Sequence, residues 1–402
     1  MVRTLKFTRY LPESGWFPHV LTVKNRDRFY TTLGHDDIPE QVAVHRSWNV
    51  LNNLSILEGG LRRLKITSQV LVPDAYCGWI PQAVRDGVRI IKTEGIELIY
   101  VSCPPFSAAL IGSALKKRTG LPLVVDFRDS WTLNPYSGRY LVPFLKKLDE
   151  KFEKTVFETA DFIITATEGI KEDYIQKYPS VRSRIEHIPN GFDTEDVPEH
   201  VELFEKFTIL YTGFFYGTRT PETLFRALEK ILRSSQIPPD KIRFLWAGPE
   251  APFVFDLADK YNIRKIVEYI GLIPKKKADE LIYQSHLLYF VIGGTENHMD
   301  NTTLTGKIFP YLASGRPLLA EIPAGAAGEM IRKYSDNSFI TSHGDSDGLA
   351  EAILRSYTSW STGKNIPVGS EKTERFREEY SFRKLSNRIG NVFDKCNRTH
   401  GP

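Results

Sequence analysis

Residues 211–222 have the residue types that suit the binding of a phosphorylated ligand. The segment follows an apolar run and leads into a helix that we expect to begin near Pro221. Glycines let a backbone approach a ligand closely, and a helix N-terminus and an arginine both attract phosphate oxygens. A turn between a strand and a helix with a solvated arginine is the alternative interpretation. The residues that we predict to face a diphosphate here are Gly213, Gly217 and Arg219, and Phe214 is a further candidate for binding the donor.

A second segment, residues 301–317, contains a Thr-Gly-Lys step at a predicted helix start. The hydroxyl of Thr305, the ammonium of Lys307 and the free backbone amides around Gly306 can converge on phosphate oxygens at such a place. The segment is not a Walker A loop, because its upstream glycines have the wrong spacing. A surface lysine on a capped helix is the simpler alternative.

Charged residues follow the apolar run at residues 123–127. Arg128 and Asp129 come directly after it, and α/β proteins bind their ligands at the carboxyl ends of parallel strands. We therefore predict that this pair faces a ligand. A structural ion pair at the surface is the alternative.

Another candidate follows the apolar run at residues 317–321, where Gly328 and Glu329 lie in a predicted helix start. Small residues let a sugar or a nucleotide lie close to the backbone amides, and a glutamate accepts hydrogen bonds from hydroxyl groups. Loop glycines with a glutamate near a helix start explain the segment almost as well.

The segments that must position these residues are short apolar runs that alternate with stretches of helical periodicity. The runs are apolar on both faces and rich in β-branched and aromatic residues, as buried parallel strands are. This alternation predicts an α/β protein with parallel sheets. The predicted strands are residues 20–23, 98–102, 123–127, 162–166, 208–212, 243–247, 267–270, 287–292 and 317–321. The clearest predicted helices are residues 107–117, 144–157, 221–232 and 275–284.

The chain of 402 residues is too long for one ordinary hydrophobic core and indicates two domains. We predict a Rossmann-like domain at residues 1–193, a second one at residues 206–370, and a C-terminal helix at residues 371–402 that packs back across both. Such domains usually open with a strand and a glycine-rich turn, but this sequence opens on a helical pattern at residues 4–11. We therefore expect that the first strand of the N-terminal domain is missing.

The composition argues against several classes of protein. A formal net charge of +4 is too small to indicate nucleic-acid binding. The cysteines Cys77, Cys103 and Cys396 are too few and too widely spaced for a disulfide framework or a zinc site, so we expect no metal. The sequence has no apolar run of about 18 residues and no signal peptide. We expect a cytoplasmic protein, with peripheral association at the inner face of the membrane as the alternative location.

Taken in order along the chain, these segments resemble the retaining glycosyltransferase family 4 of the GT-B fold, especially bacterial members from polysaccharide clusters. The resemblance covers nearly the whole chain. In the first half it rests on KFTRYLP with GW, PPFS, DFRDSW and PNG, at residues 6–12 with 15–16, 104–107, 126–131 and 189–191. In the second half it rests on YTG with YGTR, WAG, TGK and YLASGRP, at residues 211–213 with 216–219, 246–248, 305–307 and 311–317.

The resemblance implies two facing Rossmann-like domains, of which the second binds a nucleotide diphosphate sugar and the first an acceptor. It implies a hexosyltransferase that needs no metal and no cofactor beyond this co-substrate. The acceptor would be a glycan or a lipid-linked group in polysaccharide or glycolipid biosynthesis. Its hydroxyl attacks the anomeric carbon on the face from which the diphosphate leaves, and the diphosphate takes the proton. Preorganised cations near the diphosphate would stabilise the charge that grows on it.

The resemblance also assigns roles to residues. Arg219 and Lys307 would be the cations on the diphosphate, while Arg128 and Asp129 would face the transferred sugar. Among the donor-binding residues, Gly213 would hold the diphosphate, Ile273 would line the base and Glu329 would lie near donor hydroxyls or phosphate. The full donor-binding set is Gly213, Phe214, Gly217, Ile273, Thr305, Gly306, Gly328 and Glu329.

The sequence departs from the family at two further positions. Many members carry two glutamates with seven residues between them, the second of which contacts the ribose, and Thr302 and Pro310 stand there instead. A proline inside a helix removes a backbone donor and kinks the helix, so we expect disturbed geometry at Pro310. The alternative function is a catalytically impaired homologue that binds a sugar nucleotide or a partner. A sugar-nucleotide epimerase is a third reading, but it needs convergent acid/base carboxylates and histidines that the sequence does not reveal.

Overall fold

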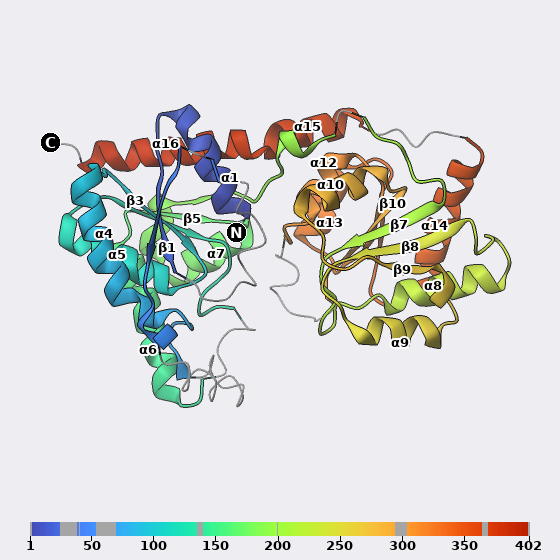
Figure 1. The fold of residues 1–402 in the computed structure, drawn as a ribbon, viewed down its shortest axis with the longest axis horizontal. Coiled ribbons are helices and arrows are strands. Elements are labelled where there is room, and N and C mark those ends of the chain that lie inside the picture. Colours follow the sequence, from blue (N-terminus) through green and yellow to red (C-terminus); the bar gives the residue numbers. More distant parts are fainter. Residues whose placement is uncertain are drawn as a thin grey trace. The chain divides into compact units, whose positions relative to one another are not determined.

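The computed structural model describes residues 2–24, 38–39, 41–53, 70–134, 140–198, 200–293, 304–363 and 369–400. The chain forms two compact units (Figure 1). Unit 1 comprises Met1–Pro189 together with Phe382–Pro402, and unit 2 comprises Asn190–Ser381. Both units consist of parallel strands and helices, so the α/β class expected from the alternating pattern is confirmed.

Unit 1 contains a four-stranded parallel sheet in the order β3-β4-β5-β6 and a separate two-stranded parallel sheet, β1-β2. The strands are β1 (His19–Val23), β2 (Ala43–Ser47), β3 (Ile99–Cys103), β4 (Leu123–Phe127), β5 (Phe162–Thr165) and β6 (Ile185–His187). The helices are α1 (Val2–Tyr10), α4 (Ile80–Glu94), α5 (Ser107–Thr119), α6 (Pro143–Thr159), α7 (Glu168–Lys177) and α16 (Phe382–His400).

Each face of the four-stranded sheet buries its own hydrophobic cluster. Neighbouring residues of a strand point to opposite faces, so Val125 packs with residues of α4, α5 and α6, whereas Val124 packs with residues of α1 and α16. Helix α16 contributes Leu385 and Ile389, both fully buried, to the second cluster. The sheet is therefore covered on both sides, as its apolar strands require.

Unit 2 contains one six-stranded parallel sheet in the order β12-β11-β10-β7-β8-β9. The strands are β7 (Phe207–Thr212), β8 (Ile242–Ala247), β9 (Val267–Tyr269), β10 (Leu287–Val291), β11 (Leu318–Glu321) and β12 (Phe339–Thr341). The helices are α8 (Glu222–Arg233), α9 (Pro252–Lys260), α10 (Lys275–Gln284), α12 (Ile308–Ser314), α13 (Ala326–Tyr334), α14 (Ser346–Ser361) and α15 (Glu371–Tyr380).

The chain builds this sheet outward from β7 in two directions. It first adds β8 and β9, and it then returns to the other side of β7 with β10. The order of the strands reverses between β7 and β10, and α/β proteins bind ligands outside the carboxyl ends of strands at such a switch point. The loops after β7 and β10 are therefore the expected place for a ligand in unit 2.

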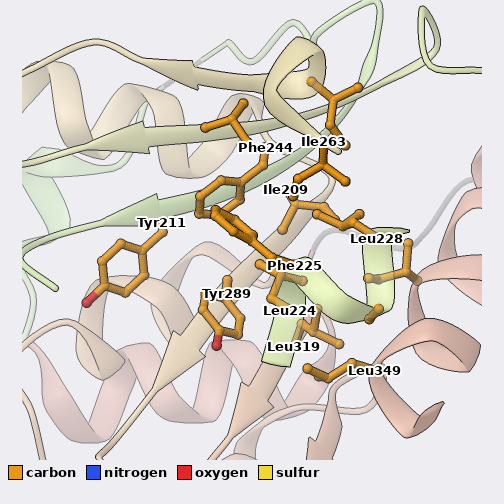
Figure 2. Packing of buried hydrophobic residues seen from close by; sticks show 14 of the residues in the cluster. Ile209, Tyr211, Leu224, Phe225, Leu228, Phe244, Ile263, Tyr289, Leu319 and Leu349 are labelled. Atoms are coloured by element: carbon orange, nitrogen blue, oxygen red, sulfur yellow. The ribbon is translucent and has the colours of Figure 1, made fainter. Parts of the chain in front are cut away.

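Two hydrophobic clusters fix these strands from opposite faces. On one face, Figure 2 shows Ile209, Phe244 and Leu319 from the sheet against helix residues that include Phe225, Leu228 and Leu349. On the other face, strand residues pack with α10, α12 and α13. The strand ends that carry the candidate residues thus rest on a sheet that is buried on both sides.

The C-terminal segment differs from the expected single helix at residues 371–402. It consists of two helices, because Ser381 between them adopts an extended backbone with φ −65° and ψ 137°. Helix α15 belongs to unit 2 and α16 to unit 1. In the described part of the chain, no helix is long and apolar enough to cross a bilayer.

Candidate functional site

The turn after β7 is fixed by hydrogen bonds to Gly213, and its backbone conformation and close contacts require glycine. The Gly213 amide donates to the Ala247 carbonyl at 2.8 Å, and the Trp246 indole donates to the Gly213 carbonyl at 3.1 Å. Gly213 has φ +134°, which residues with side chains rarely adopt. A Cβ on the adjacent Gly248 would lie 2.0 Å from the Gly213 oxygen. The two glycines therefore let the ends of β7 and β8 approach closely.

Lys307 reaches this turn from the segment after β10. It stands at the N-cap position of α12, and its Nζ lies 3.8 Å from the centroid of the Tyr211 ring. A Cβ at position 213 would lie only 2.7 Å from that Nζ. Gly213 thus makes space for the ammonium group, and the tyrosine ring attracts it through a cation–π interaction.

A second cation, Arg219, lies close enough to Lys307 for their charges to interact. The Arg219 guanidinium lies over the Tyr216 ring, 5.1 Å from its centroid. Arg219 ends a tight turn in which the amides of Tyr216 and Arg219 donate to each other's carbonyls at 3.1 and 2.9 Å. Gly217 adopts φ +56° inside this turn. The backbone therefore fixes the Cα from which the arginine extends.

The electrostatics of the two cations favour an anionic ligand. Within the part of the chain that is described, the Lys307 Nζ is buried without a hydrogen-bond partner, and the Arg219 Nε is as well. Burial holds the pKa of Lys307 well below its usual value, and the positive charge of Arg219 lowers it further. Among the described residues, neither cation forms an ion pair with a carboxylate. A bound diphosphate would supply the missing negative charge and hydrogen-bond acceptors.

Thr305 and Gly306 precede Lys307 and continue the candidate site toward the start of α12. The Thr305 hydroxyl is buried without a partner among the described residues, and a Cβ at Gly306 would meet no atom within 4 Å. Phe214 is 45% exposed and stacks on Tyr216 with the ring centroids 5.3 Å apart. The two glycine-containing segments singled out in the sequence therefore meet in the structure at Gly213 and Lys307.

The expected disturbance at Pro310 is wrong. Helix α12 begins at Ile308, so Pro310 lies in its first turn. The first amides of a helix have no partner within it, and proline removes nothing there. The following amide, that of Tyr311, still donates to the Lys307 carbonyl at 3.2 Å. Position 310 carries no carboxylate, and Thr302 lies outside the described residues.

The remaining candidates of unit 2 lie on separate segments. Ile273 follows β9 and packs against the hydrophobic cluster of α10 and α12. Gly328 is buried in α13, whereas Glu329 on the same helix is exposed. Among the described residues, no hydrogen bond or ion pair joins the Glu329 carboxylate to Lys307 or Arg219. Their predicted donor contacts stay predictions.

Arg128 and Asp129 lie in unit 1 at the carboxyl end of β4. The Arg128 Nε donates to the Cys103 carbonyl at 3.1 Å, and its guanidinium also bonds the Pro104 carbonyl. Surrounding protein atoms raise the pKa of Asp129 although its side chain is exposed, and the charge of Arg128 opposes this rise. Arg128 thus supports the β3–β4 edge, and the predicted contact of the pair with a sugar stays a prediction.

Sequence reasoning missed the aromatic residues that organise the site. Tyr211 lies under Lys307, and the Tyr311 hydroxyl accepts a hydrogen bond from the Thr212 amide at 3.0 Å. Both tyrosines belong to the sequence motifs, but they lie among apolar strand or helix residues, and this pattern predicts only packing in the hydrophobic core. Only the proximity of Lys307 reveals that the Tyr211 ring has a second role.

A cavity of about 330 Å³ that sequence reasoning also missed opens beside this loop. Thr218 and Thr220 line it together with Glu321, whose buried carboxylate accepts a hydrogen bond from the Tyr289 hydroxyl at 2.7 Å. Among the described residues, no group of three or more His, Cys, Asp or Glu side chains is arranged to hold a metal ion.

A family model and a curated relative match parts of this chain. Residues 2–196 match Glycosyltransferase Family 4. The YtcC protein of Bacillus subtilis (strain 168), assigned as a glycosyltransferase, is 20% identical over 271 residues, which span 62% of this chain and 63% of that protein. The matched part is thus less than two thirds of the relative's length.

Solved structures share the fold at low sequence identity. Sucrose-phosphate synthase from Thermosynechococcus elongatus is 15% identical with a TM-score of 0.66, over 99% of this chain and 93% of that one. The UDP-forming trehalose-phosphate synthase from Burkholderia xenovorans is 13% identical with a TM-score of 0.57, over 95% and 100%. The fold is therefore that of GT-B glycosyltransferases. The family match thus covers a little less than half of the chain, and the solved structures share its fold.

Proposed function

We propose that the protein is a retaining glycosyltransferase that moves a hexose from a nucleotide diphosphate sugar to an acceptor hydroxyl. The acceptor is a glycan or a lipid-linked group in polysaccharide or glycolipid assembly. The match of residues 2–196 to Glycosyltransferase Family 4 supports the reaction class. The solved structure of S. aureus TarM in complex with UDP (10% identical, TM-score 0.60, 98% of this chain and 96% of that one) supports a nucleotide ligand.

The observation that carries the proposal is the pair of cations at the switch point of unit 2. Lys307 and Arg219 lie close enough for one to lower the pKa of the other, and a folded chain tolerates such a pair when a ligand neutralises it. The turn of Gly213 brings backbone and ammonium group together. These features suit a diphosphate better than a neutral ligand.

The reaction that we propose uses these cations on the leaving group. The acceptor oxygen forms a bond to the anomeric carbon, and the bond from that carbon to the diphosphate oxygen breaks on the same face. The acceptor proton passes to the diphosphate. Negative charge grows on the diphosphate during this step, so fixed cations stabilise the transition state more than the ground state. The mechanism needs no protein nucleophile and no metal.

The alternative is a homologue that binds a sugar nucleotide without turnover. The observation that favours it is Pro310, since a carboxylate for the ribose is absent there. The intact helix around Pro310 argues against a wider loss of the site. Binding of a donor without release of nucleotide diphosphate would establish this alternative.

The first experiment is a thermal-shift and hydrolysis screen of the purified chain against a panel of nucleotide diphosphate sugars. We expect one donor class to stabilise the protein and to release nucleotide diphosphate slowly. NMR of the transfer product would show the retained anomeric configuration, and an epimerised donor would indicate an epimerase instead. A well-folded sample that neither binds nor hydrolyses any donor would refute the proposal.

Variants then test the two cations. Lys307→Ala and Arg219→Ala should each lower turnover by at least roughly tenfold through lost stabilisation of the leaving group.

Calorimetric titration of UDP in buffers of different ionisation enthalpy should show proton uptake by the wild type at alkaline pH, because the diphosphate raises the lowered pKa of Lys307. Lys307→Met should abolish this uptake. The exposed Lys241 serves as the control, and Lys241→Ala should change neither quantity.

A further inference from the structure

The start of α6 presents large apolar side chains to solvent. Leu141 is 58% exposed, Val142 44% and Phe144 68%, and Pro143 between them is exposed as well. Single exposed apolar residues are ordinary on a protein surface, but a contiguous group indicates an interaction site. In unit 1, α6 lies at the end opposite α16 (Figure 1).

Lysines border this apolar group. Lys146 and Lys147 follow in the next turn, and both are exposed. Residues 140–148 contain no acidic residue. The next one, Asp149, is buried, where it accepts hydrogen bonds from the Trp131 indole at 3.0 Å and the Tyr140 hydroxyl at 2.6 Å. Glu150 follows and lies 4.0 Å from the Lys146 Nζ, so it offsets part of the charge of that lysine. The surface at the start of α6 is therefore apolar at its centre and basic at its margin.

The stability of the helix does not explain these residues. Val142 occupies the N-cap position and makes no side-chain cap hydrogen bond, although Ser, Thr, Asp and Asn stabilise a helix there. The first turn contains no acidic residue to interact with the helix dipole. The helix is anchored farther along instead, where Val156 and Phe157 are buried in the core of unit 1. Pro143 suits the first position of a helix, whereas the exposed Leu141, Val142 and Phe144 are better suited to an external partner than to the fold.

We propose that residues 141–147 form a membrane-docking surface that inserts its apolar side chains into the interface of an anionic bilayer. Apolar side chains beside lysines bind such surfaces through burial and through attraction to anionic headgroups. Charge complementarity favours a bilayer over a second copy of this chain, because a symmetric dimer would bring the same lysines together. The proposal does not rest on the proposed glycosyltransferase activity, since binding to vesicles needs no donor.

Co-sedimentation with vesicles tests this surface. The full chain should bind phosphatidylcholine vesicles that contain phosphatidylglycerol, and pure phosphatidylcholine only weakly. Leu141→Ser combined with Phe144→Ser should lower partitioning at least about tenfold through lost apolar burial. Lys146→Gln combined with Lys147→Gln should weaken binding and reduce its salt dependence. The matched controls are Phe17→Ser, which removes a 75% exposed aromatic residue elsewhere in unit 1, and the exposed pair Lys276→Gln with Lys277→Gln.

Three outcomes would overturn the proposal. The first is a wild type that fails to bind anionic vesicles, and the second is a set of α6 variants that bind as well as the wild type. The third is a loss of binding in the control variants as large as in the α6 variants. Light scattering supplies a further check, since a wild-type dimer that the α6 variants convert to a monomer would assign the surface to self-association. Thermal unfolding confirms that each variant is folded, and donor hydrolysis that persists in the α6 variants separates this surface from the proposed reaction.

Discussion

Lys307 owes its chemistry to the residues around it rather than to its own type. A lysine in water is protonated and hydrated, but here the Nζ is buried over the Tyr211 ring and next to another cation. The backbone of Gly213 lines this site, and no side chain fits between Gly213 and the Lys307 Nζ. A buried charge without a counter-charge is costly, so this arrangement is better matched to a bound anion than to the free protein.

Substitution at Gly213 tests this geometry at the scale of one residue. In Gly213→Ala, the new Cβ would lie 2.7 Å from the Lys307 Nζ, so the ammonium must move. We expect the affinity for UDP to fall at least about tenfold, as for the loss of one charged contact. Gly363→Ala is the matched control, because Gly363 of unit 2 also has positive φ and open space around its Cβ and lies outside the candidate site. It should cost about 1 kcal/mol of stability and leave affinity nearly unchanged. Equal losses of affinity would mean that backbone strain at a glycine of positive φ, and not the position of Lys307, lowers the affinity.

At the scale of the element, the strands that carry the site are joined by a buried histidine. The Thr208 amide at the start of β7 donates to the His286 Nδ1 at 3.0 Å, and the His286 amide donates to the Thr208 carbonyl at 3.1 Å. These bonds connect β7 to the residue before β10, the pair of strands at the switch point. Burial lowers the pKa of His286 to about 4, and the charges of Arg316 and Arg243 contribute. The neutral ring is therefore part of the folded structure.

This histidine predicts acid sensitivity. Between pH 6.5 and about 4, the unfolded chain protonates His286 and the folded chain does not. The free energy of unfolding should therefore fall as the pH drops through this window, by up to about 1.4 kcal/mol per unit. In His286→Asn, an amide oxygen replaces the acceptor without titrating, so urea unfolding at pH 7 and pH 5 should show a smaller loss. His200→Asn, at an exposed position, should retain the full loss. The same pH dependence in both variants would exclude His286 as the cause.

At the scale of the whole molecule, the chain divides its hydrophobic residues between two units. The clusters of unit 1 include residues from both ends of the chain, since α1 and α16 pack on the same face of the sheet. The clusters of unit 2 lie within residues 190–381. Each unit thus has a core of its own, and the unfolding of the two need not coincide.

Truncations in the two cores test whether the units unfold separately. Leu385 in α16 and Leu228 in α8 are both fully buried, one in each unit. Replacement of either by Ala should cost about 2–5 kcal/mol. In a calorimetric scan, we expect Leu385→Ala to lower the midpoint temperature of one unfolding transition and Leu228→Ala to lower that of the other. One transition that both variants shift equally would show that the chain unfolds as a single cooperative unit.

The sequence by itself determined the elements and the motifs, because these depend on local patterns. Apolar runs between helical stretches predicted the parallel strands, and glycines beside cations predicted the phosphate-binding segments at residues 211–222 and 301–317. Strands β2, β6 and β12 were not predicted, and most of their residues are only partly buried. Local pattern also misjudged Pro310, since only the start of α12 at Ile308 shows that the proline lies in a first turn.

Only the tertiary structure decided which of these residues meet. Gly213 and Lys307 are far apart in the chain, and the strand order that puts β7 beside β10 brings them together. The same order places the Tyr211 ring under the ammonium group and leaves that group without a counter-charge among the described residues. Burial and electrostatic coupling depend on all neighbours in space, and a sequence records only those along the chain.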